Sequence, residues 1–294
     1  MIQANGLVMH VQQLPQPAGG GDTGDVDDTG APASAGNPSG DEPGLAGADG
    51  PPIAVLIHGI GSDNLASWYL SLAHPLAAVG FRVIMYDLRG HGRTERPSTG
   101  YRLDDLVDDL VALLDRLGVD RPVHLLGNSL GGTVAFGYAA RHPDRVVSIV
   151  AVEAAPATTE WLDRVGHQLS RAANPAEGSG MASVAASRGE RGARYAAAVH
   201  ELVTSTTAAQ DLPASTPADP MTMRTVTCPV LGIFGSDSAA ADLAPALAEL
   251  LPQSRLVVIP GHRHAVLVTA RDQVRDQVLP WLARQQAGSP VLRH

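Results

Sequence analysis

Short apolar runs alternate with helical patterns through most of the chain after residue 52. Runs that are apolar throughout are typical of strands buried on both faces of a sheet. Their alternation with helices indicates a mostly parallel sheet with helices on both faces, which is an α/β fold. The predicted strands are Ile53–Ile57, Arg82–Tyr86, Val123–Leu126, Val146–Val152, Val230–Phe234 and Leu256–Ile259.

Apolar residues recur with helical spacing in the segments between these strands. From Leu103 to Leu117, leucine and valine return at intervals of three and four, which predicts an amphipathic helix. Leu130 to Ala140 begins with glycines and small residues and is predicted to be a second helix. Gln273 to Arg284 is expected to form a terminal helix that packs on the sheet.

The N-terminal part of the chain contains an interruption. Leu7 to Leu14 can form an edge strand, but from Pro15 to Pro52 the chain consists mainly of Gly, Asp, Ala, Pro and Ser. Such a segment buries too little apolar surface to offset the loss of chain entropy on folding. We therefore expect a disordered acidic insertion at 15–52 within the domain.

A second interruption is expected to be a lid. Ala157 to Met223 has no strand pattern, is rich in Ala, Ser and Thr, and contains helical stretches at Glu160–Ser170 and Glu190–Val203. The predicted organisation is a core formed by residues 1–156 and 224–294, with a helical cap at 157–223.

Composition and charge narrow the classes of function. With 294 residues and 44% hydrophobic residues, the chain can bury a sizeable core. Its formal charge is −9, but seven acids lie between Pro15 and Pro52, so the remainder is nearly neutral. All 21 basic residues are arginine, and no basic stripe indicates a nucleic-acid partner.

Targeting signals and cysteine chemistry add little. The chain shows neither a signal-peptide pattern nor 18 consecutive apolar residues, so we expect a cytoplasmic protein without a membrane span. A single cysteine, Cys228, excludes an intrachain disulfide, and its place before a predicted strand favours a buried structural thiol.

The strongest chemical signal is the sequence GNSLG at 127–131, between a predicted strand and a predicted helix. A nucleophile on such a sharp turn needs small residues two positions before and after it, because neighbouring backbone approaches closely. Gly127 and Gly131 meet this need. Ser129 would then lie at a helix N-terminus, where N–H groups stabilise developing negative charge. Ser129 is therefore the candidate nucleophile.

A second motif, HGIG at 58–61, follows the first buried strand. A tetrahedral intermediate needs two donors directed at one oxygen. The N–H of Leu130 can supply one donor, and the N–H of Ile60 can supply the other. His58 itself is interpreted as a structural histidine that fixes this loop.

Together the motifs resemble the α/β-hydrolase superfamily, specifically its lid-bearing members with an HGxG loop. The resemblance covers Ile53 to roughly Arg284 and rests on four motifs in order, namely HGIG at 58–61, DLRGHGRT at 87–94, GNSLGG at 127–132 and PGHRH at 260–264. It implies an α/β-hydrolase fold and a serine hydrolase that needs no metal or organic cofactor. In that family the DxRGHGxS element is structural, and Thr94 stands here where serine is commoner.

The resemblance also implies a catalytic histidine in the loop after the last strand, commonly within PGxGH. Alignment on Pro260 and Gly261 puts His264 at that position, with Arg263 in place of the usual glycine and His262 as the competitor. A neutral imidazole there would take the Ser129 proton and return it to the leaving group.

The acid departs from the usual family pattern. Its commonest site lies three residues beyond the glycine that follows Val230–Phe234, and this position is Ser238, with Asp237 one residue early. A minority arrangement, DxxP after the preceding strand, is matched by Glu153 in EAAP. A carboxylate ending an apolar strand is costly to bury without a partner such as an imidazolium. Glu153 is therefore favoured, with Asp237 as the alternative acid.

The expected reaction is hydrolysis of an ester or thioester acyl bond through an acyl-enzyme. The lid is poor in aromatic residues apart from Trp161 and Tyr195, which are the candidate substrate-binding residues. A lid of this size and composition favours a small-molecule substrate with a medium-sized apolar acyl group, either free or carrier-bound, over a polymer. The sequence specifies neither the physiological substrate nor the oligomeric state.

Other activities share this scaffold. A carbon–carbon bond hydrolase acting on ring-cleavage products is compatible with Asn128, because such members often carry Asn before the serine. Amidases, aminopeptidases, lactonases and cofactor-free haloperoxidases also use the fold, whereas epoxide hydrolases and dehalogenases carry Asp as nucleophile. A non-catalytic ligand-binding protein on the same scaffold is the alternative from another class.

Overall fold

A computed structural model of the chain describes residues 1–15, 50–61, 63–173, 193–194 and 196–287. Most of the predicted insertion, residues 16–49, lies outside the described residues, as do Tyr195 and part of the predicted helix Glu190–Val203. Within the described residues, no helix is long and apolar enough to cross a membrane.

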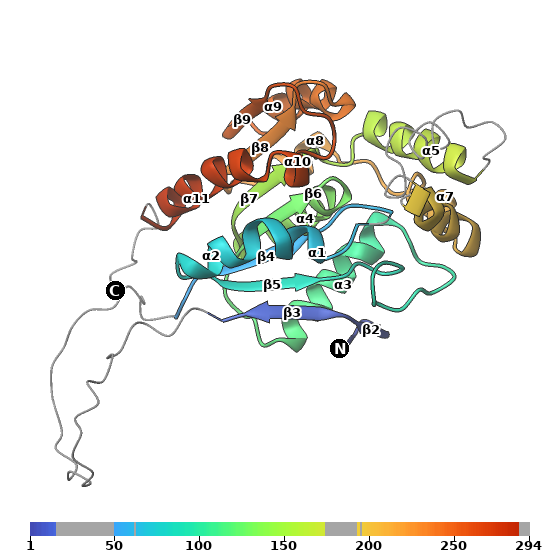
Figure 1. The fold of residues 1–294 in the computed structure, drawn as a ribbon, viewed down its shortest axis with the longest axis horizontal. Helices are drawn as coiled ribbons and strands as arrows, with labels where there is room; N and C mark the ends of the chain where they lie inside the picture. Colours follow the sequence, from blue (N-terminus) through green and yellow to red (C-terminus); the bar gives the residue numbers. More distant parts are fainter. Residues whose placement is uncertain (16–49, 62, 174–192, 195, 288–294) are drawn as a thin grey trace, which may run out of the picture.

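A seven-stranded sheet in the order β3-β5-β4-β6-β7-β8-β9 forms the centre of the fold (Figure 1). Only β3 runs antiparallel to its neighbour, β5, and the other pairs are parallel. The strands are β3 (Val11–Leu14), β4 (Ile53–Ile57), β5 (Arg82–Tyr86), β6 (Val123–Asn128), β7 (Val146–Val152), β8 (Val230–Gly235) and β9 (Ser254–Ile259).

All six strands predicted after residue 52 are therefore confirmed. They were recognisable because both faces of the parallel strands are covered, which makes them apolar throughout. The N-terminal run Leu7–Leu14 is divided: β2 (Leu7–Met9) pairs with β1 (Ile2–Ala4) in a separate hairpin, and β3 alone forms the edge of the main sheet.

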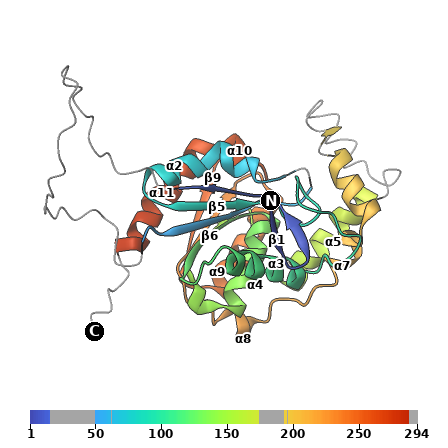
Figure 2. The ribbon, with the colours of Figure 1, turned by 90° about the horizontal axis from the view of Figure 1, so that it is seen from below.

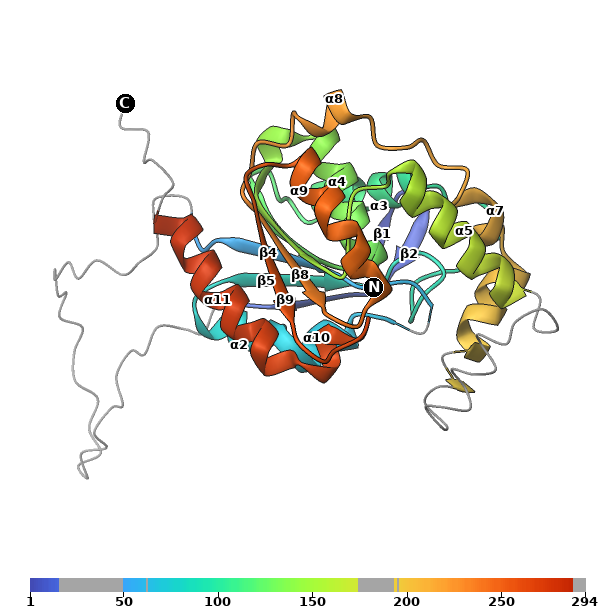
Figure 3. The same ribbon diagram turned by 90° about the horizontal axis from the view of Figure 1, so that it is seen from above.

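Two layers of helices cover the sheet, as Figures 2 and 3 show from below and above. Strand β4 illustrates the division: Val55 and Ile57 pack into one apolar cluster, and Leu56 packs into the other. The first layer contains α3 (Leu103–Arg116), α4 (Leu130–Arg141) and α9 (Ala244–Leu250); the second contains α1 (Ala66–Trp68), the π-helical turn Tyr69–Ala73, α2 (His74–Ala78), α10 (Val266–Thr269) and α11 (Arg271–Ala287).

The predicted helices at 103–117, 130–140 and 273–284 correspond to α3, α4 and α11. The run from α1 to α2, α9 and α10 are among the short helical segments that were not predicted. In the first of these, the sequence from Leu65 to Val79 is apolar on nearly all sides, so no helical periodicity separates a buried face from an exposed one.

Between β7 and β8 the described residues form helices and connecting loops and contain no strand. The helices are α5 (Thr159–Ala173), a helical stretch at 196–205, α7 (Ala208–Asp211) and α8 (Pro220–Met223). Helices α5 and α7 lie side by side beyond the carboxyl ends of the parallel strands (Figure 1). The assignment of 157–223 as a lid stays a prediction.

Candidate active site

Ser129 lies on the turn between β6 and α4, with φ 52° and ψ −121°. This positive φ is strained for any residue other than glycine, and such strain is characteristic of functional sites. The flanking glycines have a steric reason. A Cβ on Gly131 would overlap the carbonyl groups of Ile57 and His58, and a Cβ on Gly127 would overlap the backbone of Gly132. The motif thus holds the Ser129 hydroxyl at the end of the sheet.

His264 approaches this hydroxyl from the loop between β9 and α10. Its Nε2 lies 3.0 Å from Ser129 Oγ, and 55% of its side chain is exposed. The competing His262 instead directs Nδ1 to Thr269 Oγ1 at 3.1 Å. Of the two histidines in the motif, the structure brings His264 to Ser129.

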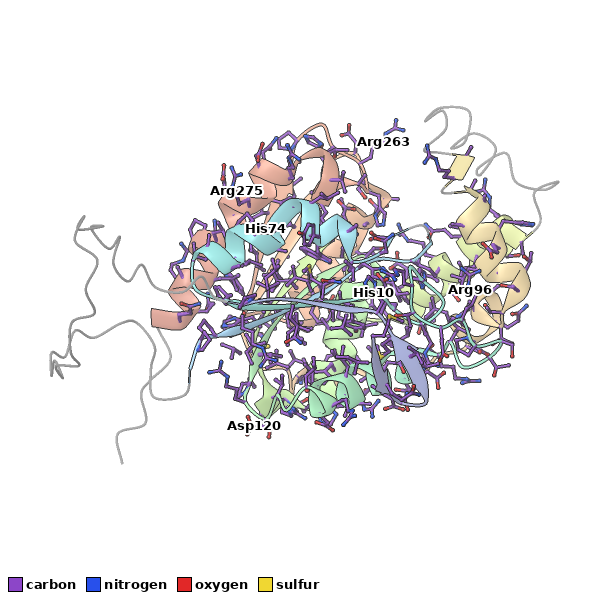
Figure 4. The ribbon with its side chains drawn as sticks, turned by 60° about the horizontal axis from the view of Figure 1, so that its bottom comes forward. His10, His74, Arg96, Asp120, Arg263 and Arg275 are labelled. Carbon is purple, nitrogen blue, oxygen red and sulfur yellow. The ribbon has the colours of Figure 1, made fainter. Side chains whose placement is uncertain are left out.

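Arg263, which replaces the glycine usual in the family, does not obstruct this contact. Its side chain is exposed and projects outward at the edge of the core (Figure 4). The substitution therefore leaves the space between His264 and Ser129 unoccupied by the guanidinium group.

Glu153 completes a chain of hydrogen bonds. Its Oε2 lies 3.0 Å from His264 Nδ1, and its side chain is fully buried. Glu153 follows β7 directly and, like Ser129, has a positive φ, of 56°. The buried carboxylate has two further donors: the N–H of Gly235 binds Oε1 at 2.5 Å, and the hydroxyl of Ser238 binds Oε2.

Asp237, the alternative acid, does not reach His264 in the structure. Its side chain is exposed, and its Oδ1 accepts a hydrogen bond of 2.7 Å from Ser236 Oγ. Because it stands one residue before Ser238, its carboxylate is directed away from the buried end of β8.

The partners of His264 define its tautomer. A carboxylate only accepts hydrogen bonds, so His264 Nδ1 carries the proton that faces Glu153. Nε2 is then free to accept the Ser129 hydroxyl proton. This arrangement suits a general base directed at a serine nucleophile.

The HGIG loop lies against Ser129. A Cβ on Gly59 would be 3.2 Å from Ser129 Cβ. The N–H of Gly59 binds Asp63 Oδ2 at 2.7 Å, and the N–H of Gly61 binds His91 Nε2 at 3.0 Å. Within the described part of the chain, the N–H groups of Ile60 and Leu130 have no acceptor and remain available to bind an oxyanion.

Two buried histidines hold this loop. His58 donates from Nδ1 to its neighbour's carbonyl at Gly59, 2.6 Å away, and its Nε2 accepts the N–H of Leu88. His91 donates from Nδ1 to the carbonyl of Arg89 and accepts from Gly61 through Nε2. Burial, reinforced by the nearby His58, lowers the pKa of His91 to about 4. His91 is therefore neutral at pH 7, as its role as acceptor requires.

The DLRGHGRT segment is anchored by its charged residues. Asp87 is buried and accepts the backbone N–H of Leu65 at 2.8 Å and that of Arg93 at 2.9 Å. Arg89 forms a bidentate buried pair with Asp109 of α3, with two N–O distances of 2.6 Å. These contacts agree with the structural role that the resemblance implies for this segment.

The remaining candidates have less defined roles. Trp161 of α5 is 6% exposed and packs into the apolar cluster that includes α4 and α9, so its contact with substrate stays a prediction. Tyr195 lies outside the described residues.

Cys228 is buried, and burial raises the pKa of its thiol to about 12, which fits a structural residue. Among the described side chains, no cluster of three or more metal-ligating residues occurs.

Sequence reasoning missed two residues of this neighbourhood. Asp63 and His91 both bind backbone N–H groups of the HGIG loop. His91 is part of the DLRGHGRT motif, so its proximity had a signal in the family pattern. Asp63 has no motif of its own, and only the three-dimensional turn shows its contact with Gly59.

Comparison with known proteins supports the fold. Residues 52–174 match the family described as alpha/beta hydrolase fold. A carboxylesterase structure from the thaumarchaeon Nitrososphaera gargenis is 27% identical, covers 81% of this chain and 92% of its own, and superimposes with a TM-score of 0.65. The protein therefore has the α/β-hydrolase fold.

Curated relatives match over shorter stretches. Epoxide hydrolase B of Mycobacterium tuberculosis is 38% identical over 106 residues, which are 34% of this chain and 28% of the relative. The 2-hydroxymuconate semialdehyde hydrolase of Pseudomonas sp. (strain CF600) is 39% identical over 115 residues, which are 38% of this chain and 40% of the relative. The chain thus spans less than half the length of the curated relatives it matches.

Proposed function

We propose that the protein is a serine hydrolase that cleaves an ester or thioester acyl bond through an acyl-enzyme. The observation that carries the proposal is the chain of hydrogen bonds from Glu153 through His264 to Ser129, with both links 3.0 Å long. In this proposal Ser129 is the nucleophile, His264 the general base and Glu153 the acid.

The proposed reaction has two halves. As Ser129 Oγ attacks the carbonyl carbon, His264 Nε2 takes the hydroxyl proton, and the buried Glu153 carboxylate stabilises the resulting imidazolium. The imidazolium then gives that proton to the leaving alcohol or thiol as its bond to the acyl carbon breaks. Water enters, loses a proton to His264 and attacks the acyl carbon. The bond to Ser129 Oγ then breaks, the imidazolium returns the proton to Oγ, and the acid leaves.

Negative charge on the carbonyl oxygen needs stabilisation in both halves. The N–H groups of Ile60 and Leu130 are the proposed donors. Leu130 follows Ser129 directly, Ile60 follows Gly59, which lies against Ser129, and neither N–H has an acceptor among the described residues. Loss of one such donor typically costs about 100-fold or more in kcat.

The exposure of the site supports a broad choice of leaving group. With 55% of the His264 side chain exposed, the leaving group is expected to extend toward solvent, which accommodates a free alcohol or a carrier-bound thiol. The acyl group is expected to face the helices of 157–223, where Trp161 is the candidate apolar contact.

A carbon–carbon bond hydrolase is the second candidate. It is favoured by the similarity to 2-hydroxymuconate semialdehyde hydrolase and by Asn128, which precedes Ser129 and whose buried Oδ1 has no hydrogen-bond partner among the described residues. Epoxide hydrolysis is not proposed despite the similarity to epoxide hydrolase B, because position 129 carries a serine in place of the aspartate nucleophile of that class.

Two measurements test the proposal. A fluorophosphonate probe is expected to label Ser129 in the folded protein and not in Ser129→Ala; absence of labelling would favour a non-catalytic binding protein. A panel of p-nitrophenyl esters of graded chain length, run beside acyl thioesters and a dienone, then distinguishes the activities. Turnover of the dienone alone would replace ester hydrolysis with carbon–carbon bond cleavage.

A further inference from the structure

Asp63 links the two segments that flank the proposed oxyanion site. Its Oδ2 accepts the N–H of Gly59 at 2.7 Å and the side-chain Nδ2 of Asn128 at 3.1 Å, while its Oδ1 accepts the N–H of Asn64 at 2.9 Å. Gly59 belongs to the HGIG loop and Asn128 immediately precedes Ser129. One carboxylate therefore joins this loop to the turn that carries the nucleophile.

The carboxylate is also close to the nucleophile. The position that a Cβ on Gly59 would occupy lies 3.1 Å from Asp63 Oδ2 and 3.2 Å from Ser129 Cβ. The Asp63 carboxylate and Ser129 thus both lie close to the same point of the HGIG loop. A charge on Asp63 would therefore act close to the carbonyl that Ser129 is proposed to attack.

We propose that Asp63 is a positioning residue that aligns the Ile60 and Leu130 N–H groups, and that its charge makes the enzyme select acyl groups without a carboxylate. The proposal rests on the serine-hydrolase function proposed above. It adds a substrate class, neutral acyl groups, and a residue outside the Ser129–His264–Glu153 chain.

The alignment of the Ile60 N–H follows from the hydrogen bonds that the neighbouring backbone N–H groups already make. On either side of Ile60, the N–H of Gly59 is bound by Asp63 and the N–H of Gly61 is bound by His91. Because the N–H groups of both neighbours are bound, the orientation of the Ile60 N–H is held although it has no acceptor among the described residues. Preorganised donors of this kind stabilise charge without reorganisation during the reaction.

Only an ionised carboxylate matches this set of donors. Asp63 receives hydrogen bonds from three N–H groups, and a carboxylate offers acceptors on both oxygens. An amide at position 63 would have to direct its own N–H₂ toward one of these donors. Asp63→Asn therefore keeps nearly the same shape but replaces one acceptor oxygen with an N–H₂ donor. The substitution should loosen the HGIG loop.

The charge argument concerns the acyl group of the substrate. Like charges a few ångströms apart repel, and the repulsion is stronger near the low-dielectric protein interior than in water. Hence an acyl group that carries a carboxylate near the scissile carbonyl should react more slowly than a neutral group of similar size.

The first test measures alignment. For Asp63→Asn we expect kcat on a neutral p-nitrophenyl ester to fall about tenfold or more, with KM changed less than about twofold. A trifluoromethyl ketone forms a tetrahedral adduct with an oxyanion, so its Ki should rise by the same factor as kcat falls. Asp120→Asn, an exposed aspartate at the far end of the core (Figure 4), is the matched control.

Parallel losses of kcat and ketone affinity support the alignment role. Unchanged values for both in a folded Asp63→Asn protein would overturn it. If that variant does not fold, Asn128→Ala removes a single link of the three, and a smaller rise in the ketone Ki is expected; an unchanged Ki would again contradict the proposal.

The second test measures charge selection. Wild-type protein should prefer p-nitrophenyl butyrate to mono-p-nitrophenyl succinate, and Asp63→Asn should narrow this preference about fivefold, since the Coulomb term is removed. An unchanged ratio of the two hydrolysis rates would overturn the proposal that the Asp63 charge selects the acyl group. A wild-type protein that cleaves no ester and binds no ketone would contradict the proposed function itself, whereas an active wild type with an unaffected Asp63→Asn would contradict this inference alone.

Discussion

Ser238 donates its hydroxyl hydrogen to the same Glu153 oxygen that binds His264 Nδ1. Ser238 occupies the position that most members of the family use for the acid. In this chain the carboxylate comes from the neighbouring strand, and the residue at the usual position has become its hydrogen-bond donor. The longer glutamate side chain spans the additional distance from β7.

Two variants test whether Glu153 or Asp237 is the catalytic acid. Glu153→Gln keeps the shape but removes the charge that stabilises the imidazolium, so kcat should fall by about 100-fold or more. Asp237→Asn should change kcat by less than about twofold, because Asp237 is exposed and bonded to Ser236. Steady-state kinetics on a p-nitrophenyl ester decides between them. The reverse result would reassign the acid to Asp237.

The hydroxyl of Ser238 should itself contribute to activity. Hydrogen bonds to charged groups are worth about 1.5–3 kcal/mol, so Ser238→Ala is expected to lower kcat/KM about tenfold by loosening the Glu153 carboxylate. Ser238→Thr retains the hydroxyl and should retain most of the activity. Equal rates for the alanine and threonine variants would show that the hydrogen bond has no catalytic consequence.

The buried pair of Arg89 and Asp109 should be important for stability. Asp109→Ala leaves an unpaired guanidinium in the interior, so the free energy of unfolding should fall by about 3–5 kcal/mol. Asp115→Ala breaks the exposed pair with Arg145 and should cost less than about 1 kcal/mol. Urea denaturation of the two variants measures both losses. Similar losses of unfolding free energy would contradict the larger contribution expected of the buried pair.

Stability should decrease as the solution is acidified below pH 6.5. Burial lowers the pKa values of His91 and His124 to about 4. The unfolded chain therefore binds more protons than the folded chain between pH 6.5 and 4, which favours unfolding as the pH falls. Each residue contributes up to about 3 kcal/mol over this window.

Urea denaturation at pH 7 and pH 4.5 measures this effect. His124→Gln removes one of the two titrating groups, so the loss of unfolding free energy between the two pH values should be smaller in this variant than in wild type. An identical loss would show that His124 does not contribute to the acid sensitivity.

The sheet was predictable from sequence because its strands are buried on both faces and therefore apolar throughout. Leu7–Leu14 was harder to interpret, since hairpin and sheet-edge strands follow one another there with only His10 between them. The run from α1 to α2 was missed because its residues are apolar on almost every side.

The candidate site was predictable where a motif constrains the backbone. GNSLG requires its glycines for steric reasons, and the order of the motifs pointed to His264. The acid remained open between Glu153 and Asp237, because its choice depends on how far a side chain reaches between adjacent strands. Asp63 could not be predicted, since its partners include backbone N–H groups that any sequence would supply.

Ser129 and Glu153 share a left-handed backbone, with φ of 52° and 56°. Non-glycine residues in this region cost of order 1–3 kcal/mol each. Ser129→Gly would relieve that strain while removing the proposed nucleophile, so this variant should melt at a higher temperature than the native chain. The proposed catalytic centre is thus the part of the fold that selection for stability alone would have replaced.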